Sequence, residues 1–469
     1  MSETEYDFVV IGGGSAGYAG AVVASRLGLR TVVIEGGEEV GGLCILRGCM
    51  PSKTLLESAY RAHSIRSASE FGLRGEYQGP DGPAIRDRKR RLIGEFAHYR
   101  KEQLESGQFE FVRGLARFTD PHTVEIAEMN GGSRTIRGRT FLLATGSQLN
   151  WIEVPGLKET GCLTSDDVLD NDHIPKSVIV LGGGAIGVEL ASFYEGVGSK
   201  VALVQRSSHL VKEMDFDVSE TLVTAFSTHG IQVFTGTELL RAEKTPTCKR
   251  VCVRHLGTEL ALEAEEIIYA LGRRPSTESL DLGRAGVKTL PRGTIKITAE
   301  QQSSVAHIFA AGDASGPYEV VHIAVQQAEL AARNAARMLK SPGEKLESMD
   351  YALKLFAVFS HPEMASVGLT AKEAAEMELS FIEAKYPFSD HGKSMLKGET
   401  AGFVKLLADA ATRRIIGGAV IGPNASELIH EITVAMSFKA TAGQLAQVPH
   451  YHPTLSEIWT YPAEALAEG

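Results

Sequence analysis

The sequence has little cysteine, no long apolar run and no excess of positive charge. Its 469 residues include only five cysteines, too few for a secreted scaffold held together by disulfides. No apolar stretch approaches the roughly 18 to 20 residues that a membrane span requires. With 48 basic and 58 acidic residues the net charge is −10, which gives no support to a nucleic-acid partner. We therefore expect a cytoplasmic protein with no membrane span.

What is present is the composition of an ordinary globular protein. Apolar residues make up 43% and charged residues 23% of the chain. At roughly 150 residues per domain, the length predicts about three domains. The fold class that the patterns below indicate is α/β.

The first 35 residues predict a dinucleotide-binding unit. An apolar strand over 6–11 leads into a turn and a helix, and a second strand over 31–35 ends at Glu35. The turn carries the three glycines of the G-x-G-x-x-G pattern, Gly12, Gly14 and Gly17. They permit a tight turn, a close approach of a pyrophosphate and close packing of helix on strand. Glu35 is placed to accept hydrogen bonds from a ribose.

The same pattern recurs later in the chain, so two dinucleotide folds are predicted. A strand over 177–181 precedes Gly182, Gly184 and Gly187, and another strand covers 200–204. The position that matches Glu35 holds Gln205, followed by Arg206 and later by Lys212.

The missing carboxylate bears on the choice of nicotinamide nucleotide. An acid at this position favours a free 2′-hydroxyl, whereas Arg206 and Lys212 could pair with the 2′-phosphate of NADP(H). Gly187, on the other hand, often accompanies NAD(H) sites, and Arg206 can be read as a solvated surface residue. The pattern favours NADP(H) and leaves NAD(H) open.

Three further strand-and-turn segments indicate returns of the chain to a shared sheet, at 141–147, 267–275 and 308–313. We therefore expect the second dinucleotide unit to be inserted in the first. The predicted boundaries are 1–150 and 273–345 for an FAD-binding domain, 151–272 for an NAD(P)-binding domain, and 346–469 for a C-terminal α+β interface domain. Strands in that last part are expected at 356–359, 403–407 and 415–421, and helices at 371–377 and 425–438.

A basic run at 86–91 opens a stretch with a helical pattern. Such runs are usually a solvated helix face, and docking of an acidic partner is the alternative.

Cys44 and Cys49 lie five positions apart, shortly after the first unit. Their sulfurs can meet if the local backbone is helical or distorted helical. A metal centre would need more cysteine or histidine ligands nearby, and none is present in the surrounding sequence. The remaining functional interpretation is a redox disulfide beside a flavin.

The stretch Gly41–Lys53 resembles the active-site signature of the class I pyridine nucleotide-disulfide oxidoreductases, the family of dihydrolipoamide dehydrogenase, glutathione reductase and mercuric reductase. The resemblance covers essentially the whole chain, through 144–147, 182–189, 270–275, 311–313 and 452–457.

The resemblance implies a set of catalytic residues. Cys44 would exchange with the substrate and Cys49 would lie next to the flavin. Lys53 would pair with Glu189 near the reactive flavin nitrogen. His452, held by Glu457, would be the acid-base catalyst. In this family the histidine comes from the other subunit, so a homodimer is implied.

The resemblance also implies two cofactors, FAD and a nicotinamide nucleotide, and no metal. The residues expected to hold FAD are Gly12, Gly14, Ser15, Gly17, Glu35, Gly42, Lys53, Gly114, Ala116, Thr145, Gly146, Ser147, Asp313 and His322. Those expected to hold NADP(H) or NAD(H) are Gly182, Gly184, Gly187, Gln205, Arg206, Lys212 and Gly272.

The physics of thiols supports these roles. A thiolate rather than a thiol attacks a disulfide, so Cys44 needs a base, and a histidine fixed by a carboxylate is the usual one. Arg47, between the two cysteines, departs from the family pattern. Our hypothesis is that it lowers a thiol pKa or meets an anionic substrate, and the alternative is that it points to FAD phosphates or to solvent.

Absences narrow the choice within the family. No cysteine follows Cys252, so C-terminal redox pairs are missing. Val22 and Val23 stand where glutathione reductases place a substrate-binding arginine, and Ala185 stands where they carry a gating tyrosine. Glutathione is therefore a poor candidate substrate. The pattern is most similar to dihydrolipoamide dehydrogenase, with a lipoyl-carrying protein as a possible substrate. The alternatives are an NADPH-dependent reductase of another disulfide, quinone or metal substrate, and a flavoprotein subunit of a larger assembly that docks through 86–91 or 459–461.

Overall fold

The structure, a computed structural model, describes residues 4–468, and the chain divides into two compact units. The first unit consists of Met1–Ser52, Asp87–Asn150 and Gly272–Asp350. The second consists of Lys53–Arg86, Trp151–Leu271 and Tyr351–Gly469. In sequence, the second dinucleotide fold falls between segments of the first unit.

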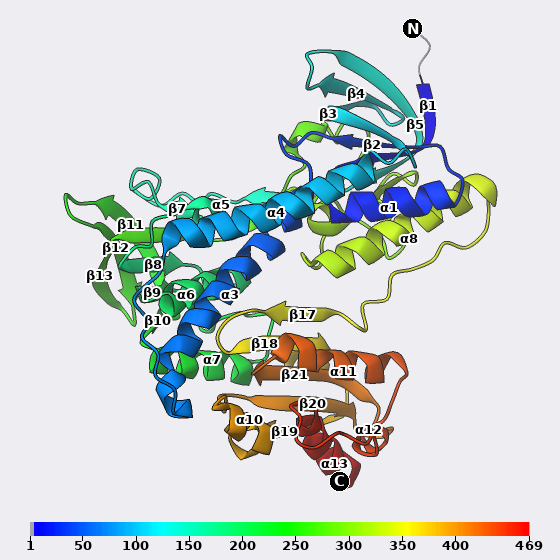
Figure 1. Cartoon of the computed structure of the whole chain (residues 1–469). Helices are drawn as coiled ribbons and strands as arrows, with labels where there is room; N and C mark the ends of the chain where they lie inside the picture. Colours follow the sequence, from blue (N-terminus) through cyan, green and yellow to red (C-terminus); the bar gives the residue numbers. More distant parts are fainter. Residues whose placement is uncertain (1–3, 469) are drawn as a thin grey trace. The chain divides into compact units, whose positions relative to one another are not determined.

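A six-stranded sheet forms the centre of the first unit (Figure 1). β1 pairs in parallel with β2 and β5, β2 with β3, and β16 with β5, while β3, β4 and β5 form an antiparallel meander. The strands are β1 (Thr4–Ile11), β2 (Thr31–Glu35), β3 (Glu110–Asp120), β4 (Thr123–Glu128), β5 (Ser133–Leu143) and β16 (Ile308–Ala310). A small ribbon joins β6 (Ser147–Leu149) to β15 (Arg273–Pro275).

Helices cover this sheet. α1 (Ser15–Arg26) and α8 (Val321–Lys340) pack side by side (Figure 1). α2 (Gly42–Leu46), η2 (Glu278–Leu280) and η3 (Gly312–Ala314) are short. Strand β1 is buried on both faces, because Phe8 and Val10 belong to one apolar cluster and Val9 and Ile11 to another. Such continuous apolar strands are typical of parallel sheets covered on both sides.

The second unit contains a five-stranded parallel sheet in the order β10-β9-β8-β14-β7 and a three-stranded antiparallel sheet. The parallel strands are β7 (Leu163–Thr164), β8 (Ser177–Leu181), β9 (Lys200–Val204), β10 (Gln232–Phe234) and β14 (Glu266–Tyr269). The antiparallel strands are β11 (Glu238–Lys244), β12 (Lys249–His255) and β13 (Thr258–Ala264). Helices α5 (Ser165–Asp170), α6 (Ala185–Gly196) and α7 (Phe216–Thr228) belong to the same part.

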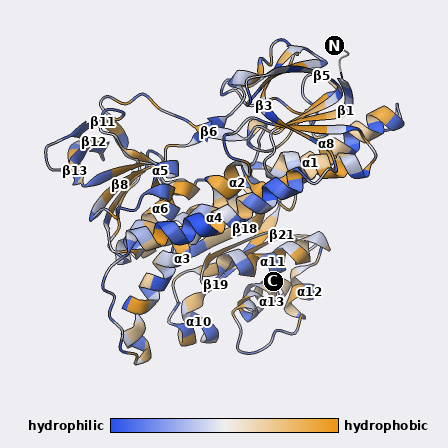
Figure 2. Cartoon of the chain, turned by 45° about the horizontal axis from the view of Figure 1, so that its top comes forward, coloured by the Kyte–Doolittle hydropathy of each residue, from blue (hydrophilic) through white to orange (hydrophobic). Residues whose placement is uncertain are grey.

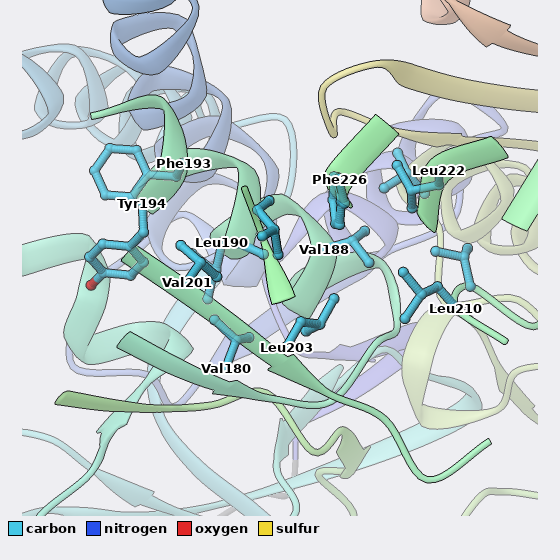
Figure 3. Packing of buried hydrophobic residues seen from close by; sticks show 14 of the residues in the cluster. Val180, Val188, Leu190, Phe193, Tyr194, Val201, Leu203, Leu210, Leu222 and Phe226 are labelled. Carbon is cyan, nitrogen blue, oxygen red and sulfur yellow. The ribbon is translucent and has the colours of Figure 1, made fainter. Parts of the chain in front are cut away.

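A continuous apolar core holds this part together. Figure 3 shows Val180 of β8 and Leu203 of β9 facing side chains of α6 and α7, among them Phe193 and Phe226. All four are almost fully buried. The positions of the two glycine-flanked strands are therefore fixed by packing.

The C-terminal segment of the second unit carries an antiparallel sheet in the order β17-β18-β21-β20-β19. Its strands are β17 (Leu355–Val358), β18 (Glu363–Gly368), β19 (Phe381–Pro387), β20 (Phe403–Asp409) and β21 (Ile415–Gly422). Its helices are α9 (Ala371–Glu376), η4 (Phe388–Asp390), α10 (Gly392–Lys397), α11 (Ala425–Ser437), α12 (Ala442–Ala446), η5 (Ser456–Trp459) and α13 (Thr460–Glu468). The predicted α+β texture of this region is confirmed.

Three helical segments connect these parts along the chain: α3 (Cys49–Arg66), η1 (Ala68–Phe71) and α4 (Gly82–Leu104). Figure 2 shows that α4 is mostly hydrophilic. The basic run lies within α4 rather than opening it, and Arg88, Arg90 and Arg91 are exposed as expected. Lys89, however, is buried, so the expectation of a wholly solvated face is wrong at that position.

A second expectation is also corrected. The alternative of a larger assembly places Trp459 on a docking surface, but Trp459 is fully buried and its indole N–H donates to the carbonyl of Leu428 at 3.1 Å. Tyr461 is stacked on Tyr386, with ring centroids 3.9 Å apart. Trp459 is therefore part of the core, whereas Tyr461 remains exposed. Within residues 4–468, no helix is long and apolar enough to cross a membrane.

Candidate functional site

The first glycine turn, between β1 and α1, has no room for side chains. Gly12 has a φ of +106°, and a Cβ there would stand 2.3 Å from the carbonyl oxygen of Ala144. A Cβ on Gly17 would stand 1.8 Å from the carbonyl oxygen of Gly12. Gly14 and Gly42 approach each other so closely that a Cβ on Gly42 would lie 2.5 Å from the Gly14 Cα. The open N-terminus of α1, which starts at Ser15, is thereby left accessible to phosphate groups.

Glu35 ends β2 beside this turn. Its carboxylate accepts hydrogen bonds from the backbone N–H of Gly13 at 2.7 Å and of Gly37 at 2.6 Å. Arg113, which sequence reasoning missed, donates to the carbonyl of Glu35 at 3.3 Å and of Glu38 at 3.1 Å. The carboxylate is thus oriented by the backbone, in a position suited to a ribose diol.

A second group of predicted residues lies after β5. The Ser147 hydroxyl donates to Asp313 Oδ2 at 2.6 Å, and Arg273 Nε donates to the Ser147 hydroxyl at 3.0 Å. Thr145 Oγ1 is buried and has no hydrogen-bond partner among residues 4–468. An orphaned hydroxyl of this kind is costly unless a ligand satisfies it.

The remaining residues predicted for FAD are distributed over the same unit, apart from Lys53. Gly114 and the buried Ala116 lie on β3, and the Gly114 carbonyl would stand 3.0 Å from a Cβ on Gly36. Gly146 has a φ of +67°, and His322 lies in the first turn of α8. These features fit a flavin dinucleotide: the glycine turn leaves room for it, the Glu35 carboxylate is oriented, and the Thr145 hydroxyl lacks a partner. Glu35, the glycines and Asp313 would hold the cofactor.

Cys44 and Cys49 are placed by two consecutive helices. Cys44 lies in α2 and is half-buried, and Cys49 is exposed and begins α3. A Cβ on the intervening Gly48 would stand 3.1 Å from the Cys44 Cα, so a side chain there would be tightly packed against α2. Arg47 pairs with Glu39 at 3.0 Å, and both side chains are exposed. The backbone between the cysteines is therefore distorted helical, because α2 ends at Leu46 and α3 begins at Cys49.

The second glycine turn repeats the first. A Cβ on Gly182 would stand 2.2 Å from the Ala270 carbonyl oxygen, and one on Gly187 would stand 1.8 Å from the Gly182 carbonyl oxygen. Gly184 is the N-cap of α6. The side-chain oxygen of Gln205 accepts from the Gly183 N–H at 3.2 Å. Gln205 thus reproduces the bond of Glu35 without its charge.

Arg206 and Lys212 follow Gln205 and are both exposed. Neither makes an ion pair with any residue between 4 and 468. Both cations are available for an anionic ligand. Gly272, which the sequence groups with this nucleotide, falls in the first unit and has a φ of +106°.

Lys53 and Glu189 form an ion pair within the second unit. Lys53 Nζ lies 2.8 Å and 2.9 Å from the two carboxylate oxygens of Glu189. Lys53 also lies 4.6 Å from the ring centre of Phe359, whose N–H donates to Glu189 at 3.0 Å. Glu189 is buried, whereas the Lys53 side chain is 31% exposed, so only the carboxylate of the pair is shielded from water.

His452 and Glu457 form a second pair in this unit. His452 Nδ1 lies 3.0 Å from Glu457 Oε2, and the imidazole side chain is 81% exposed while that of Glu457 is 13% exposed. Glu457 Oε1 also lies 3.4 Å from Nε2 of the fully buried His391. Burial lowers the pKa of His391, and the Glu457 carboxylate opposes that shift. Nothing in the sequence near 391 signals this support.

The second unit also contains a cluster of histidines that the sequence does not predict. The rings of His63, His229 and His361 lie with centroids 4.5 to 5.6 Å apart. No group of three or more acidic, cysteine or histidine side chains among the described residues is arranged to hold a metal ion.

Two dinucleotide folds, one inserted in the other, together with a close cysteine pair define the class of flavin-dependent and nicotinamide-dependent disulfide oxidoreductases. The chain belongs to the pyridine nucleotide-disulphide oxidoreductase family, whose profile matches residues 6–328, and the dimerisation domain of that family matches residues 356–463. It is an enzyme, and its cofactors are FAD and NAD(H) or NADP(H).

Several relatives resemble the chain over nearly its whole length. A dihydrolipoyl dehydrogenase of Thermus scotoductus is 35% identical, covering 98% of this chain and 97% of the relative. A mercuric reductase of Bacillus cereus is 33% identical, covering 97% of this chain and 70% of the relative. The solved structure of LpdA from Mycobacterium tuberculosis has a TM-score of 0.87 at 26% identity, with 99% of each chain covered.

Proposed function

We propose that this protein oxidises a dihydrolipoyl dithiol with a nicotinamide nucleotide, as its relatives named dihydrolipoyl dehydrogenase do. The observation that carries the proposal is the dyad of His452 and Glu457, in which a largely covered carboxylate orients an exposed imidazole. An imidazole held in this way is a suitable acid-base catalyst for a dithiol.

In this proposal Cys44 and Cys49 alternate between a disulfide and a dithiol. The dithiol substrate gives two electrons and two protons to this pair and leaves as a disulfide. His452 accepts a proton from the attacking substrate thiol, because only a thiolate attacks a disulfide sulfur. FAD supplies the two-electron transfer between the reduced cysteines and the nucleotide. Lys53 and Glu189 form a fixed charge pair for which we propose a role near the flavin.

The test is a stopped-flow comparison of NADH, NADPH and dihydrolipoamide as reductants of the purified holoenzyme, followed at the flavin and thiolate charge-transfer bands. Rapid reduction by dihydrolipoamide, reversed by an oxidised nucleotide, is the expected result. An enzyme that NADPH reduces and dihydrolipoamide leaves oxidised would overturn the proposal.

That outcome would favour a second candidate, an NADPH-dependent reductase of another disulfide, quinone or metal substrate. The specific support is Gln205, which keeps the bond to Gly183 without a carboxylate, and the exposed Arg206 and Lys212 beside it. A 2′-phosphate would meet two cations and no competing negative charge from residue 205.

We further propose that the protein is a homodimer in which His452 serves the cysteine pair of the other subunit, and that a lipoyl-carrying protein is its partner. The alternative is a flavoprotein subunit that is inactive alone. Size exclusion with an activity assay distinguishes them, since an active dimer would rule out the subunit alternative. The cytoplasmic location and the domain boundaries stay predictions.

A further inference from the structure

Arg100 lies in the last turns of α4, within the first unit. Two of its guanidinium nitrogen atoms have no hydrogen-bond partner among the described residues. Its Nε and Nη1 atoms are buried, and neither makes a hydrogen bond to any residue from 4 to 468. A buried guanidinium without an acceptor is destabilising, so such a group is expected to meet an anion that the chain itself does not provide.

The neighbours of the Arg100 guanidinium include Tyr18 and Cys44. The guanidinium carbon lies 4.2 Å from the ring centre of Tyr18 on α1, which is a cation-π contact. It also interacts electrostatically with the thiol of Cys44. Burial lowers the pKa of Arg100, while Tyr18, Cys44 and Tyr99 act in the opposite direction. No carboxylate is among these neighbours.

A second unpartnered group lies on the same face of α4. Gln103, three residues further along, has a buried side-chain oxygen with no hydrogen-bond partner within the described chain. Residues three apart on a helix are neighbours. Unsatisfied guanidinium donors and an unsatisfied amide acceptor therefore lie one helical turn apart on α4, and the guanidinium is an electrostatic neighbour of Cys44. Such a group of unpaired polar atoms is typical of a polar ligand site.

We propose that Arg100 is a specificity-determining residue that binds an anionic group of the disulfide substrate, such as a carboxylate, sulfonate or phosphate, while Cys44 exchanges with the substrate sulfur. This inference rests on the proposed disulfide exchange at Cys44. It goes further by specifying that the substrate carries a negative charge. Arg100 acts by binding and takes no part in proton transfer.

The first experiment measures how Cys44 in the reduced holoenzyme discriminates between iodoacetate and iodoacetamide, which differ only by a negative charge. In both reactions the thiolate displaces iodide, and mass spectrometry assigns the product to Cys44. The variants are Arg100→Gln and, as a matched control, Lys101→Gln, which removes an exposed positive charge one residue away. We expect Arg100→Gln to lower the iodoacetate to iodoacetamide rate ratio about tenfold, and Lys101→Gln to leave it unchanged.

The second experiment compares lipoate with lipoamide as substrates, again a pair that differs by one negative charge. Arg100→Gln should raise the KM for lipoate and leave that for lipoamide unchanged. If both compounds are inert but the alkylation ratio falls, the lipoyl function is wrong and the anion site stands. An unchanged alkylation ratio in Arg100→Gln overturns the inference. Loss of bound FAD in that variant also overturns it, because the guanidinium would then belong to the flavin phosphates.

Discussion

Gln205 and Glu35 occupy matching places in two similar turns and differ by one charge. Each side chain accepts a bond from a glycine N–H, at 3.2 Å in one turn and 2.7 Å in the other. The backbone geometry is therefore the same, and the nucleotide that binds at the second turn depends on what the side chain adds to it.

Substitution Gln205→Glu should shift the preference toward NADH. A carboxylate would accept from the ribose hydroxyls and repel a 2′-phosphate. We expect the NADH to NADPH ratio of kcat/KM to rise at least about tenfold, equivalent to about 1.4 kcal/mol. Lys200→Ala, at the opposite end of β9, is the control. If this kcat/KM ratio is the same in Gln205→Glu as in the wild type, residue 205 does not distinguish a 2′-hydroxyl from a 2′-phosphate.

Substitution His452→Gln should separate the two half-reactions. Removal of a general base typically costs about 10² to 10⁴ in rate, so reduction by dihydrolipoamide should fall by that factor. Reduction of the flavin by NAD(P)H should be unchanged, because it needs no dithiol deprotonation. Stopped-flow measurement of both half-reactions checks this, and an equal loss in both would contradict the assigned role.

His391 should act as a positioning residue through Glu457, from which it lies 3.4 Å away. His391→Ala should change the pH profile of dihydrolipoamide oxidation and lower its rate less than His452→Gln does. His391→Gln, which retains a polar group, should recover part of the loss. If the melting temperature falls but the pH profile is unchanged in both variants, His391 is only structural.

At the scale of the elements, the two glycine turns and the helices that follow them depend on close backbone contact. Gly17 packs α1 against the turn, whereas Gly94 lies exposed inside α4 with nothing within 4 Å of a Cβ. The same substitution should therefore have opposite effects at these two places.

Gly17→Ala should weaken FAD retention and lower the melting temperature, because its Cβ would overlap the Gly12 carbonyl oxygen. Gly94→Ala should stabilise the protein by about 0.5 to 1 kcal/mol, since alanine loses less entropy in a helix. Flavin content and thermal unfolding measure both. A stabilised Gly17→Ala would mean that α1 can move away without cost.

The sequence predicts these elements well for a physical reason. Strands β8 and β9 are buried on both faces, so each is a continuous apolar run bounded by polar or glycine residues, and both begin and end at the predicted residues. His391, Arg113 and Arg100 could not be predicted as site residues. Their importance depends on partners more than 50 residues away in sequence, and no local pattern marks such contacts.

At the scale of the whole molecule, the cluster of His63, His229 and His361 links stability to pH. Burial lowers the pKa of all three, and that of His361 to about 3. The rings and Arg66 disfavour further positive charge, and only Glu399 favours it, at His63. The folded state therefore holds these imidazoles neutral.

The free energy of unfolding should fall as the pH is lowered below about 6.5. In this range a histidine of the unfolded chain binds a proton, whereas the buried histidine of the folded protein stays neutral. His361 alone can contribute up to about 1.4 kcal/mol for each pH unit between 6.5 and 3. Melting temperatures of wild type and His361→Asn at pH 7.5 and 5.5 test this. The drop should be smaller in the variant, and the exposed His98→Asn should behave like wild type. Equal drops in all three proteins would contradict the linkage.

The discontinuity of the first unit has a consequence for biosynthesis. Its sheet closes only when β16 joins β5, and roughly 160 residues of chain lie between the two strands. A ribosome takes roughly ten to thirty seconds to add that many residues. During this interval the edge of β5 that later receives β16 is exposed in the nascent chain. The inserted segment must therefore fold, or be held by a chaperone, beside an unfinished neighbour, and the order of synthesis favours early completion of the inserted dinucleotide fold.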